Sequence, residues 1–352
     1  MHRILAINPG STSTKIGIFF DREKVEEITL RHSQDELSQY ESLSEQYDFR
    51  KELIVNALND NNYDLNEFSA IACRGGIIKA IASGTYSVDE NVVYDSKNST
   101  TDHPSNLAAL IGNELAKQFN LKAFITDPPV TFEGEEVSTI TGNPLTRRHL
   151  RFHALNHKAI AKQFCLDKGI EYNKSNIVVA HIGGGVSVGI HKQGIVADVN
   201  DALDEGPFSP ERSGSLPVFQ LVDICFSGKY THADVKKMLR GNAGFNAYLG
   251  TNDFRDVKKM VEEGNEKAKV IFDAFVYQIA KEVAAMSVNV NGKVDAIVLT
   301  GGIVYDEFFV GKLTEKVKFI ADVYSYPGEM ELEALAYGAL DVITGKEEAK
   351  VY

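Results

Sequence analysis

Residues 3–20 have the sequence RILAINPGSTSTKIGIFF, and the architecture of the chain follows from this stretch. Two apolar runs rich in branched side chains flank a break at Asn8-Pro9-Gly10, which predicts a β-hairpin with a polar tip. The tip offers backbone N–H groups and short hydroxyls with little bulk, and Lys15 adds a positive charge. Such a loop suits close approach of a phosphate, although an ordinary solvated turn has the same composition.

Length and composition indicate a globular enzyme of two domains. The chain has 352 residues, of which 43% are hydrophobic and 24% charged. Its net charge of −12 argues against nucleic acid or an anionic membrane as the main partner, so an anionic substrate would need a local basic pocket. Cys73, Cys165 and Cys225 are too far apart in sequence to suggest a disulfide framework or a zinc site. No signal segment or membrane span is recognisable, so we expect a cytoplasmic protein.

A second hairpin repeats the first one about half a chain later. Ile177–His181 is an apolar run, Gly183-Gly184-Gly185 forms the tip, and Val186–Ile190 is the returning run. The repetition predicts two copies of one β-rich domain on either side of a cleft, where two glycine tips grip a polyphosphate. We expect one domain over residues 1–150, rejoined by the last helix at 331–352, and a second over residues 151–330.

Polar residues follow two strands predicted in the first half. Arg74 comes after the strand 68–73 and precedes two glycines, so it can project into a cleft or lie solvated in a surface turn. Asp127 ends the strand 121–126 and precedes two prolines. Open α/β sheets place metal or substrate ligands at such carboxyl ends, although a turn-forming Asp before proline is also common.

A basic segment lies between the two halves. Three arginines, three histidines and a lysine fall within residues 147–158, and they predict the positive pocket that an anion needs. His153 and His157 are four residues apart, but no third ligand supports a metal site. Arg212, in a long loop, is a second arginine for the cleft. We also expect helices at 35–59 and 256–289 and a cap from Ser105 on the helix that follows it.

Seven motifs in order resemble the acetate and butyrate kinase family, within the group that includes sugar kinases, actin and the Hsp70 ATPase domain. They are INPGSTSTK at 7–15, RGG at 74–76, HPSNL at 103–107, FHALNHK at 152–158, HIGGG at 181–185, PERSG at 210–214 and ELEALA at 331–336. The resemblance covers nearly the whole chain and is closest to the butyrate branch, since Gly184 stands where acetate kinases carry Asn. It implies an α/β fold of two duplicated ribonuclease H-like domains with an ATP cleft between them, the actin-like ATPase fold.

The resemblance implies direct phosphoryl transfer from ATP to butanoate, with Mg²⁺, giving ADP and butanoyl phosphate. A carboxylate is already ionised at neutral pH and needs no general base, so arginines, a histidine and a metal should dominate the site. Isobutyrate, propionate or acetate stay open as preferred acids, and Gly75 and Gly76 leave room for the acyl chain. A sugar kinase using Asp127 as base is disfavoured by the extra arginines. An ATP-gated module of the Hsp70 or actin kind is disfavoured because no peptide-binding domain is evident.

The same resemblance assigns roles to individual residues. The catalytic residues are Asn8, Arg74, His153 and Arg212, and the metal ligands are Asp127 and Glu331, with Glu333 as the alternative to Glu331. The phosphates lie against Gly10, Ser11, Thr12, Ser13, Lys15, His181, Gly183, Gly184 and Gly185. The nucleoside lies against Asp253, Phe254, Arg255, Gly301, Gly302 and Ile303. His103, Asn106 and His157 have no assigned role, and the family resemblance implies a homo-oligomer built from dimers.

Overall fold

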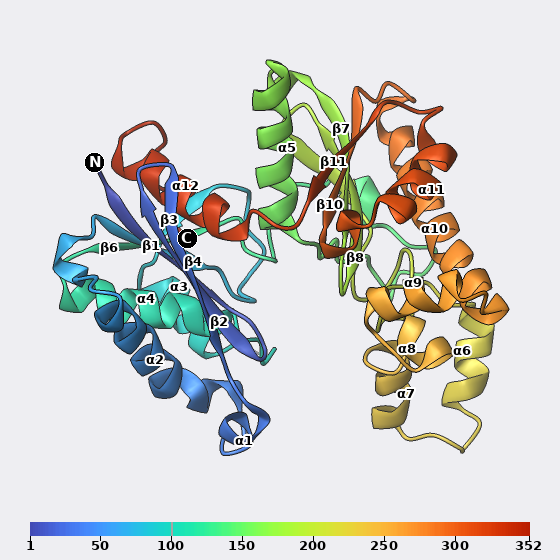
Figure 1. The fold of residues 1–352 in the computed structure, drawn as a ribbon, viewed down its shortest axis with the longest axis horizontal. Coiled ribbons are helices and arrows are strands. Elements are labelled where there is room, and N and C mark those ends of the chain that lie inside the picture. Colours follow the sequence, from blue (N-terminus) through green and yellow to red (C-terminus); the bar gives the residue numbers. More distant parts are fainter. Residues whose placement is uncertain (100) are drawn as a thin grey trace. The chain divides into compact units, whose positions relative to one another are not determined.

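The computed structural model describes residues 1–99 and 101–352, and the chain divides into two compact units (Figure 1). Unit 1 comprises residues 1–132, 154–159 and 330–352. Unit 2 comprises residues 133–153 and 160–329. Each unit contains one β-sheet with helices on both faces.

Unit 1 is built on a six-stranded sheet in the order β3-β2-β1-β4-β6-β5. The strands are β1 (Arg3–Pro9), β2 (Ser13–Phe20), β3 (Glu23–Arg31), β4 (Ala70–Arg74), β5 (Thr85–Ser87) and β6 (Lys122–Thr126). The predicted hairpin is confirmed as the antiparallel pair β1 and β2, with Ile7 opposite Ile16. Strands β1, β4 and β6 run parallel, so their carboxyl ends lie along one edge of the sheet.

Alternation of side chains along the strands buries both faces of this sheet. On one face, Leu5, Ile7 and Ile71 pack with α2 (Tyr47–Asp60), α3 (Glu90–Lys97) and α4 (Asn106–Gln118). On the other face, Ile4 and Ala72 pack with α12 (Glu331–Ile343). Figure 1 shows α12, in red, on the opposite side of the sheet from α2, α3 and α4. A short helix, α1 (Gln34–Leu37), follows β3.

Unit 2 repeats the same strand order, β9-β8-β7-β10-β11, which corresponds to β3-β2-β1-β4-β6 of unit 1. Its strands are β7 (Asn176–Ile182), β8 (Val186–Lys192), β9 (Ile195–Val199), β10 (Ala296–Gly301) and β11 (Val323–Pro327). Its helices are the later part of α5 (Ala154–Lys168), α6 (Val218–Cys225), α7 (His232–Leu239), α8 (Gly244–Leu249), α9 (Phe254–Glu262), α10 (Glu266–Met286) and α11 (Glu307–Val317). The inferred duplication of one β-rich domain is therefore confirmed.

Two predicted helices are interrupted. The stretch 256–289 is divided into α9 and α10, because Gly264 adopts a left-handed φ of +82° and the Asn265 side chain accepts a hydrogen bond from the Ala268 N–H as a new N-cap. The stretch 35–59 is helical at its start and again from Tyr47. The predicted side-chain cap from Ser105 is wrong, since its hydroxyl lies 2.6 Å from Nδ1 of His103 instead.

None of the helices in the described part of the chain combines the length and apolar character needed to cross a membrane.

Candidate active site

In unit 1, the ends of two neighbouring parallel strands and one helix start bring together Asn8, Arg74 and Glu331. Asn8 ends the apolar part of β1, Arg74 is the last residue of β4, and Glu331 is the first residue of α12. Nδ2 of Asn8 donates to Oε2 of Glu331 over 2.7 Å, and Nη1 of Arg74 donates to Oδ1 of Asn8 over 3.1 Å. Arg74 also forms an ion pair with Glu331, which is 8% exposed. The guanidinium therefore has a fixed position at the edge of the sheet.

The alternative carboxylate, Glu333, lies elsewhere. Its carboxylate pairs with Lys24 over 2.8 Å, on a different side of α12 from Glu331. Residues two apart on a helix point about 200° apart, so only one of the two can face Asn8 and Arg74. The geometry favours Glu331 as the carboxylate of this cluster.

Asp127 follows β6 at the same sheet edge and is 5% exposed. Its Oδ1 accepts hydrogen bonds from Oγ of Ser83 over 2.6 Å and from the N–H of Gly84 over 2.9 Å. Asp127 has a φ of +39°, a conformation that is uncommon outside glycine and that concentrates at functional sites. Oδ2 accepts no hydrogen bond from any described residue, so one carboxylate oxygen remains available to a ligand.

Gly75 and Gly76 make room for protein atoms rather than for a substrate. A Cβ on Gly76 would lie 2.8 Å from the Cα of Asn106, and one on Gly75 would lie 3.3 Å from the Cα of Pro128. Asn106 in turn accepts from the N–H of Ile77 over 2.7 Å and donates to the carbonyl of Thr101 over 2.8 Å. The expectation of acyl room at the two glycines is therefore wrong, and Asn106 holds the segment that follows Arg74.

The hairpin tip between β1 and β2 is the predicted phosphate loop. Ser11 and Thr12 are exposed, Ser13 is half-buried, and the N–H of Gly10 donates to the carbonyl of Ser13 over 2.7 Å. Lys15 lies opposite Asn8 in the strand register, and its ammonium makes no hydrogen bond to a described residue. The tip thus presents the hydroxyls of Ser11 and Thr12 to solvent, and the half-buried Lys15 lies just after it in β2.

In unit 2, His153 is stacked on His181. The ring centroids are 3.8 Å apart with an interplanar angle of 8°, and Nδ1 of His153 lies 2.8 Å from Oγ of Ser187. His181 and Ser187 face each other across the β7–β8 pair, because the register joins these residues. The orientation of the His153 ring is therefore fixed by two strand residues.

Arg212 lies against the second glycine tip. A Cβ on Gly185 would come within 2.9 Å of Cζ of Arg212, so only glycine accommodates the guanidinium there. Nη1 of Arg212 donates to the carbonyl of Ala202 over 2.9 Å, while the buried Nε has no partner among the described residues. Burial, and then the charge of Arg240, lower the pKa of Arg212. Ser209, in the same loop, donates to the carbonyl of Gly184 over 2.8 Å.

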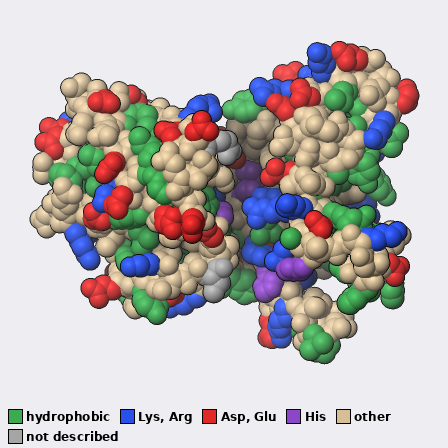
Figure 2. All heavy atoms as spheres, turned by 90° about the horizontal axis from the view of Figure 1, so that it is seen from below, with side chains coloured by type: hydrophobic (Ala, Val, Ile, Leu, Met, Phe, Trp, Pro, Cys, Tyr) green, Lys and Arg blue, Asp and Glu red, His purple; other side chains and the backbone are tan. Residues whose placement is uncertain are grey.

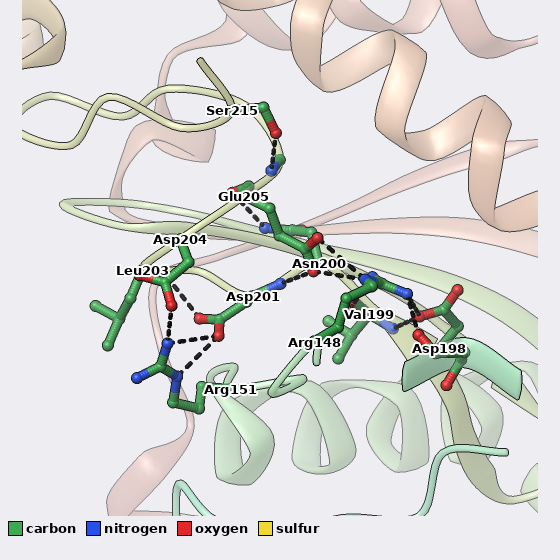
Figure 3. Close-up of polar contacts among 12 residues, drawn as sticks. Arg148, Arg151, Asp198, Val199, Asn200, Asp201, Leu203, Asp204, Glu205 and Ser215 are labelled. Carbon is green, nitrogen blue, oxygen red and sulfur yellow. Dashed lines mark hydrogen bonds and ion pairs between the residues drawn. The ribbon is translucent and has the colours of Figure 1, made fainter. Parts of the chain in front are cut away.

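Two arginines of the basic segment are neutralised by carboxylates, as Figure 3 shows. Arg148 pairs with Asp198 over 3.0 Å and with Glu205 over 2.9 Å. Arg151 pairs with Asp201 over 2.7 Å and also with Asp204. The prediction of an anion pocket is wrong for these two arginines, because four acidic side chains between residues 198 and 205 compensate them. Arg148 and Arg151 instead fix the segment 198–205, whose Ala202 carbonyl accepts a hydrogen bond from Arg212.

A pocket of about 700 Å³ lies beside the glycine tip of unit 2. It is lined by Gly183, Gly184, Pro210, Asn252, Asp253, Phe254, Arg255, Lys258, Gly302, Ile303, Tyr305 and Asp306. Seven of the predicted nucleotide-binding residues are thus brought together there. Gly301 lies outside the lining; its φ of +99° and close approach to the carbonyl of Ile182 give it a backbone role.

Three pocket residues have clear local partners. Asp253 caps α9 by accepting from the N–H of Arg255, and its hydrogen bonds with Arg255 lower the pKa of Asp253 to about 2. Phe254 lines the pocket but is only 8% exposed, and its ring packs on Phe245 and Phe309 in the core.

Sequence reasoning missed Lys258, which pairs with Asp306 over 2.7 Å at the pocket wall. Its place one helical turn after Phe254 is the signal that could have found it.

Figure 2 shows Lys, Arg and His side chains gathered on one face of unit 2, in a chain of net charge −12. Such a local positive surface suits an anionic ligand.

A magnesium ion fits Asp127. The described residues contain no group of three or more His, Cys, Asp or Glu side chains able to enclose a metal. Mg²⁺ does not require one, because it keeps several waters and is bound by one or two carboxylates together with phosphates. The buried carboxylate of Asp127, with Oδ2 available, matches that requirement.

Comparison with known proteins finds one family model and several relatives that agree on the same family. Residues 138–321 match the family model described as the acetokinase family. "Butyrate kinase 1" of Clostridium acetobutylicum is 48% identical over 354 residues, covering 100% of both chains. "Probable butyrate kinase" of Clostridium botulinum (strain Eklund 17B / Type B) is 46% identical over 353 residues, covering 100% of this chain and 99% of the relative.

Solved structures confirm the predicted fold class. Acetate kinase from Porphyromonas gingivalis superposes with a TM-score of 0.80 at 20% identity, covering 99% of this chain and 100% of that one. A propionate kinase from Francisella tularensis superposes with a TM-score of 0.75 at 19% identity, covering 96% and 99%. At these identities the likeness concerns the fold, which is the duplicated α/β fold expected from the two hairpins.

Proposed function

This chain is a member of the acetokinase family, and on that premise we propose that it transfers the γ-phosphoryl group of ATP to butanoate. The products are ADP and butanoyl phosphate. The identity of 48% to "Butyrate kinase 1" over the full length of both chains carries the choice of reaction. The clusters around Arg74 and Arg212 supply the residue types that this reaction requires.

The reaction needs charge neutralised rather than a proton removed. A carboxylic acid with a pKa near that of Glu, about 4.3, is ionised at neutral pH. One carboxylate oxygen attacks the γ-phosphorus in line, the bond from that phosphorus to the bridging oxygen breaks, and ADP leaves with the electron pair. No proton has to move, so no residue is assigned as general base.

We assign the arginines and His153 to the anions. Arg74, held by Asn8 and Glu331, binds the carboxylate, and Arg212 binds the transferred phosphoryl group. Positioned donors that face developing charge lower the barrier because they need no reorganisation during the reaction. The His153 ring, oriented by Ser187 and His181, stabilises the same phosphoryl group.

Asp127 would hold Mg²⁺ with the carboxylate oxygen that Ser83 and Gly84 leave available. When bound, the ion neutralises charge on the phosphates. Glu331 contributes by fixing Asn8 and Arg74, and Asn8 thereby keeps its amide at the sheet edge.

The pocket of about 700 Å³ in unit 2 accommodates the nucleoside, a size within the usual range for ligand sites. Gly183, Gly184 and Gly185 present backbone to the phosphates, as does the tip at Gly10–Ser13 in unit 1. Lys258 adds a positive charge at the pocket wall.

Trapping the acyl phosphate as a hydroxamate tests the reaction. The purified protein is incubated with ATP, Mg²⁺ and hydroxylamine, with butanoate, isobutyrate, propionate, acetate or a sugar as acceptor. We expect hydroxamate with butanoate and less with acetate, although one methylene discriminates by only about 1–3 kcal/mol. Absence of hydroxamate with every acid would refute the carboxylate-kinase proposal. ADP release that depends on the sugar would indicate a sugar kinase instead.

We further propose that the protein is a homo-oligomer assembled through α6. None of the residues of α6 is buried, although most are apolar. Phe219 and Phe226 are 89% and 86% exposed, and the apolar surface continues through Leu216, Val218, Val222, Ile224 and Tyr230. Aromatic side chains bury about 150–250 Å² each. A second copy of this surface would therefore supply much of the roughly 800 Å² per partner that a stable dimer requires.

Light scattering coupled to gel filtration tests this assembly. Phe219→Asp should shift the protein to monomer, because a charge would lie in the contact. Phe319→Asp is the matched control, since Phe319 is 79% exposed in the same unit but outside this surface. A monomeric wild type, or an unchanged mass for Phe219→Asp, would contradict the proposal.

A cytoplasmic location is also proposed, supported by cysteines that are all free although Cys225 is exposed. Cell fractionation followed by immunoblotting measures it.

A further inference from the structure

Arg50, on α2, is a buried arginine without a carboxylate partner. Its exposed fraction is 0%, and it is the largest fully buried side chain among the described residues. Its Nε and Nη2 both donate to Oε1 of Gln46, over 3.0 and 2.9 Å. No ion pair joins Arg50 to an acidic residue in the described parts of the chain. Burying an unpaired charge is costly, so this guanidinium needs a compensating role.

The remaining donors of Arg50 hold the hairpin tip between β1 and β2. Nη1 donates to the carbonyls of Gly10 over 2.8 Å and Ser13 over 3.3 Å, and Nη2 donates to the carbonyl of Ser11 over 3.1 Å. The carbonyl of Thr12 accepts from the N–H of His32 over 2.9 Å. Every carbonyl from Gly10 to Ser13 is therefore tied to the inside of unit 1.

The direction of these carbonyls determines the direction of the amides. In a planar trans peptide the C=O of one residue and the N–H of the next point in opposite directions. Inward carbonyls at Gly10 and Ser11 therefore turn the N–H groups of Ser11 and Thr12 outward. Neither N–H donates to a described residue, and both residues are exposed. Successive outward N–H groups form a concavity that binds anions.

We propose that Arg50 is a positioning residue for a phosphate loop at residues 10–13, and that a nucleotide phosphate bound there balances its buried charge. This inference rests on the proposed ATP-dependent function. Arg50 does not touch the phosphate. It shapes the loop from below through three carbonyls and adds a fixed positive charge under the amides.

The contacts require arginine specifically. A guanidinium presents five N–H donors in a fixed planar fork, whereas an ammonium is a compact point charge. Lysine cannot serve Gln46 and three carbonyls together. Nη1 also donates to Oγ1 of Thr14 over 3.1 Å, which leaves the Thr14 hydroxyl to donate to Nε2 of His32, 3.0 Å away. Burial, and then the charge of Arg50, lower the pKa of His32 to about 4, so His32 is the neutral acceptor that this arrangement needs.

Steady-state kinetics of Arg50→Lys and Arg50→Gln test the inference. We expect the KM for ATP to rise about ten- to hundredfold, because several hydrogen bonds to a charged group are lost, while the KM for butanoate changes less than about twofold. Lys51→Ala is the matched control. Lys51 is the next residue of the same helix, and its ammonium pairs with Asp48 and Glu114. An unchanged KM for ATP in Arg50→Lys would overturn the proposal, as would an equal rise for both substrates.

Hydrogen–deuterium exchange of the wild type gives a second readout that needs no variant. A non-hydrolysable ATP analogue should slow exchange of the amides of Ser11–Ser13. If calorimetry shows that the analogue binds but exchange of the Ser11–Ser13 amides is unchanged, the assignment is refuted, even if the variants fail to fold. Failure of the proposed function is distinguishable, because a wild type that binds the analogue but yields no hydroxamate refutes carboxylate phosphorylation only.

Discussion

Replacing Gly185 with alanine should disable the enzyme without unfolding it. The added methyl group would lie 2.9 Å from Cζ of Arg212 and closer still to Nη1, whereas ordinary contacts begin near 3.4 Å. Gly185 does not have a left-handed φ, so alanine fits the backbone. All three atoms nearest to the methyl group belong to the guanidinium, which can retreat at little cost in folding free energy.

The displacement of the Arg212 guanidinium determines how far kcat falls. The guanidinium has to move by roughly 0.5–1 Å, and a displacement of about 1 Å at a reacting centre costs on the order of 100-fold in rate. The movement also lengthens the hydrogen bond from Nη1 to the carbonyl of Ala202, which is 2.9 Å. We therefore expect kcat for hydroxamate formation to fall roughly 30- to 100-fold, or about 2–3 kcal/mol in the barrier.

The assay compares four variants with the wild type at saturating ATP and butanoate: Gly185→Ala, Gly311→Ala, Arg212→Ala and the double variant Gly185→Ala/Arg212→Ala. Gly311→Ala is the control, because Gly311 is exposed on α11 and an added Cβ meets nothing within 4 Å. In an Arg212→Ala background, Gly185→Ala should cause no further loss, because it acts through the missing guanidinium. Full activity of Gly185→Ala, or an equal loss in both backgrounds, would refute this reasoning.

Two further predictions concern one residue in each unit. Arg74→Ala should lower kcat more than about 100-fold while calorimetry still shows ATP binding. The control Arg22→Ala removes a surface pair with Asp341 and should leave kcat unchanged. An unfolded Arg74→Ala protein would mean that Arg74 is structural. Burial, and then the charges of Glu205 and Asp198, raise the pKa of Glu282 from 4.5 to about 7, so its ionisation opposes folding and stability is lost as pH rises through 7. Glu282→Gln should therefore be more stable than the wild type by up to about 3 kcal/mol in urea at pH 8 and about equal at pH 4; the same difference at both pH values would contradict this.

The duplicated architecture was predictable because its signals are local. Apolar runs around glycine tips specify the pairs β1–β2 and β7–β8, and parallel strands then bring Asn8 and Arg74 to one edge without further information. The division between α9 and α10 was missed because helical periodicity continues on both sides of it. Gly264 and Asn265, a C-terminal glycine followed by an N-cap residue, were the available signal.

Charge partners were the part that could not be predicted. The basic residues at 147–158 are evident in the sequence, but their compensation depends on tertiary pairing with residues 198–205. The same limit applies to Arg50, which looks like an ordinary helix-surface charge and is instead fully buried. A count of charges predicts the local excess, while the pairing geometry decides whether a guanidinium remains available to a ligand.

The return of the chain to unit 1 through α12 has a consequence for biosynthesis. Leu332, Leu335 and Leu340 cover the face of the first sheet that carries Ile4 and Ala72, yet the ribosome makes them long after the strands of that sheet. About 200 residues separate the two parts of this core, so at 5–20 residues per second the nascent sheet stays uncovered for on the order of 10–40 s. During that time unit 2 can complete its own core while the sheet of unit 1 presents an apolar surface. The nascent chain should therefore be a substrate for chaperones until residues 330–343 leave the exit tunnel.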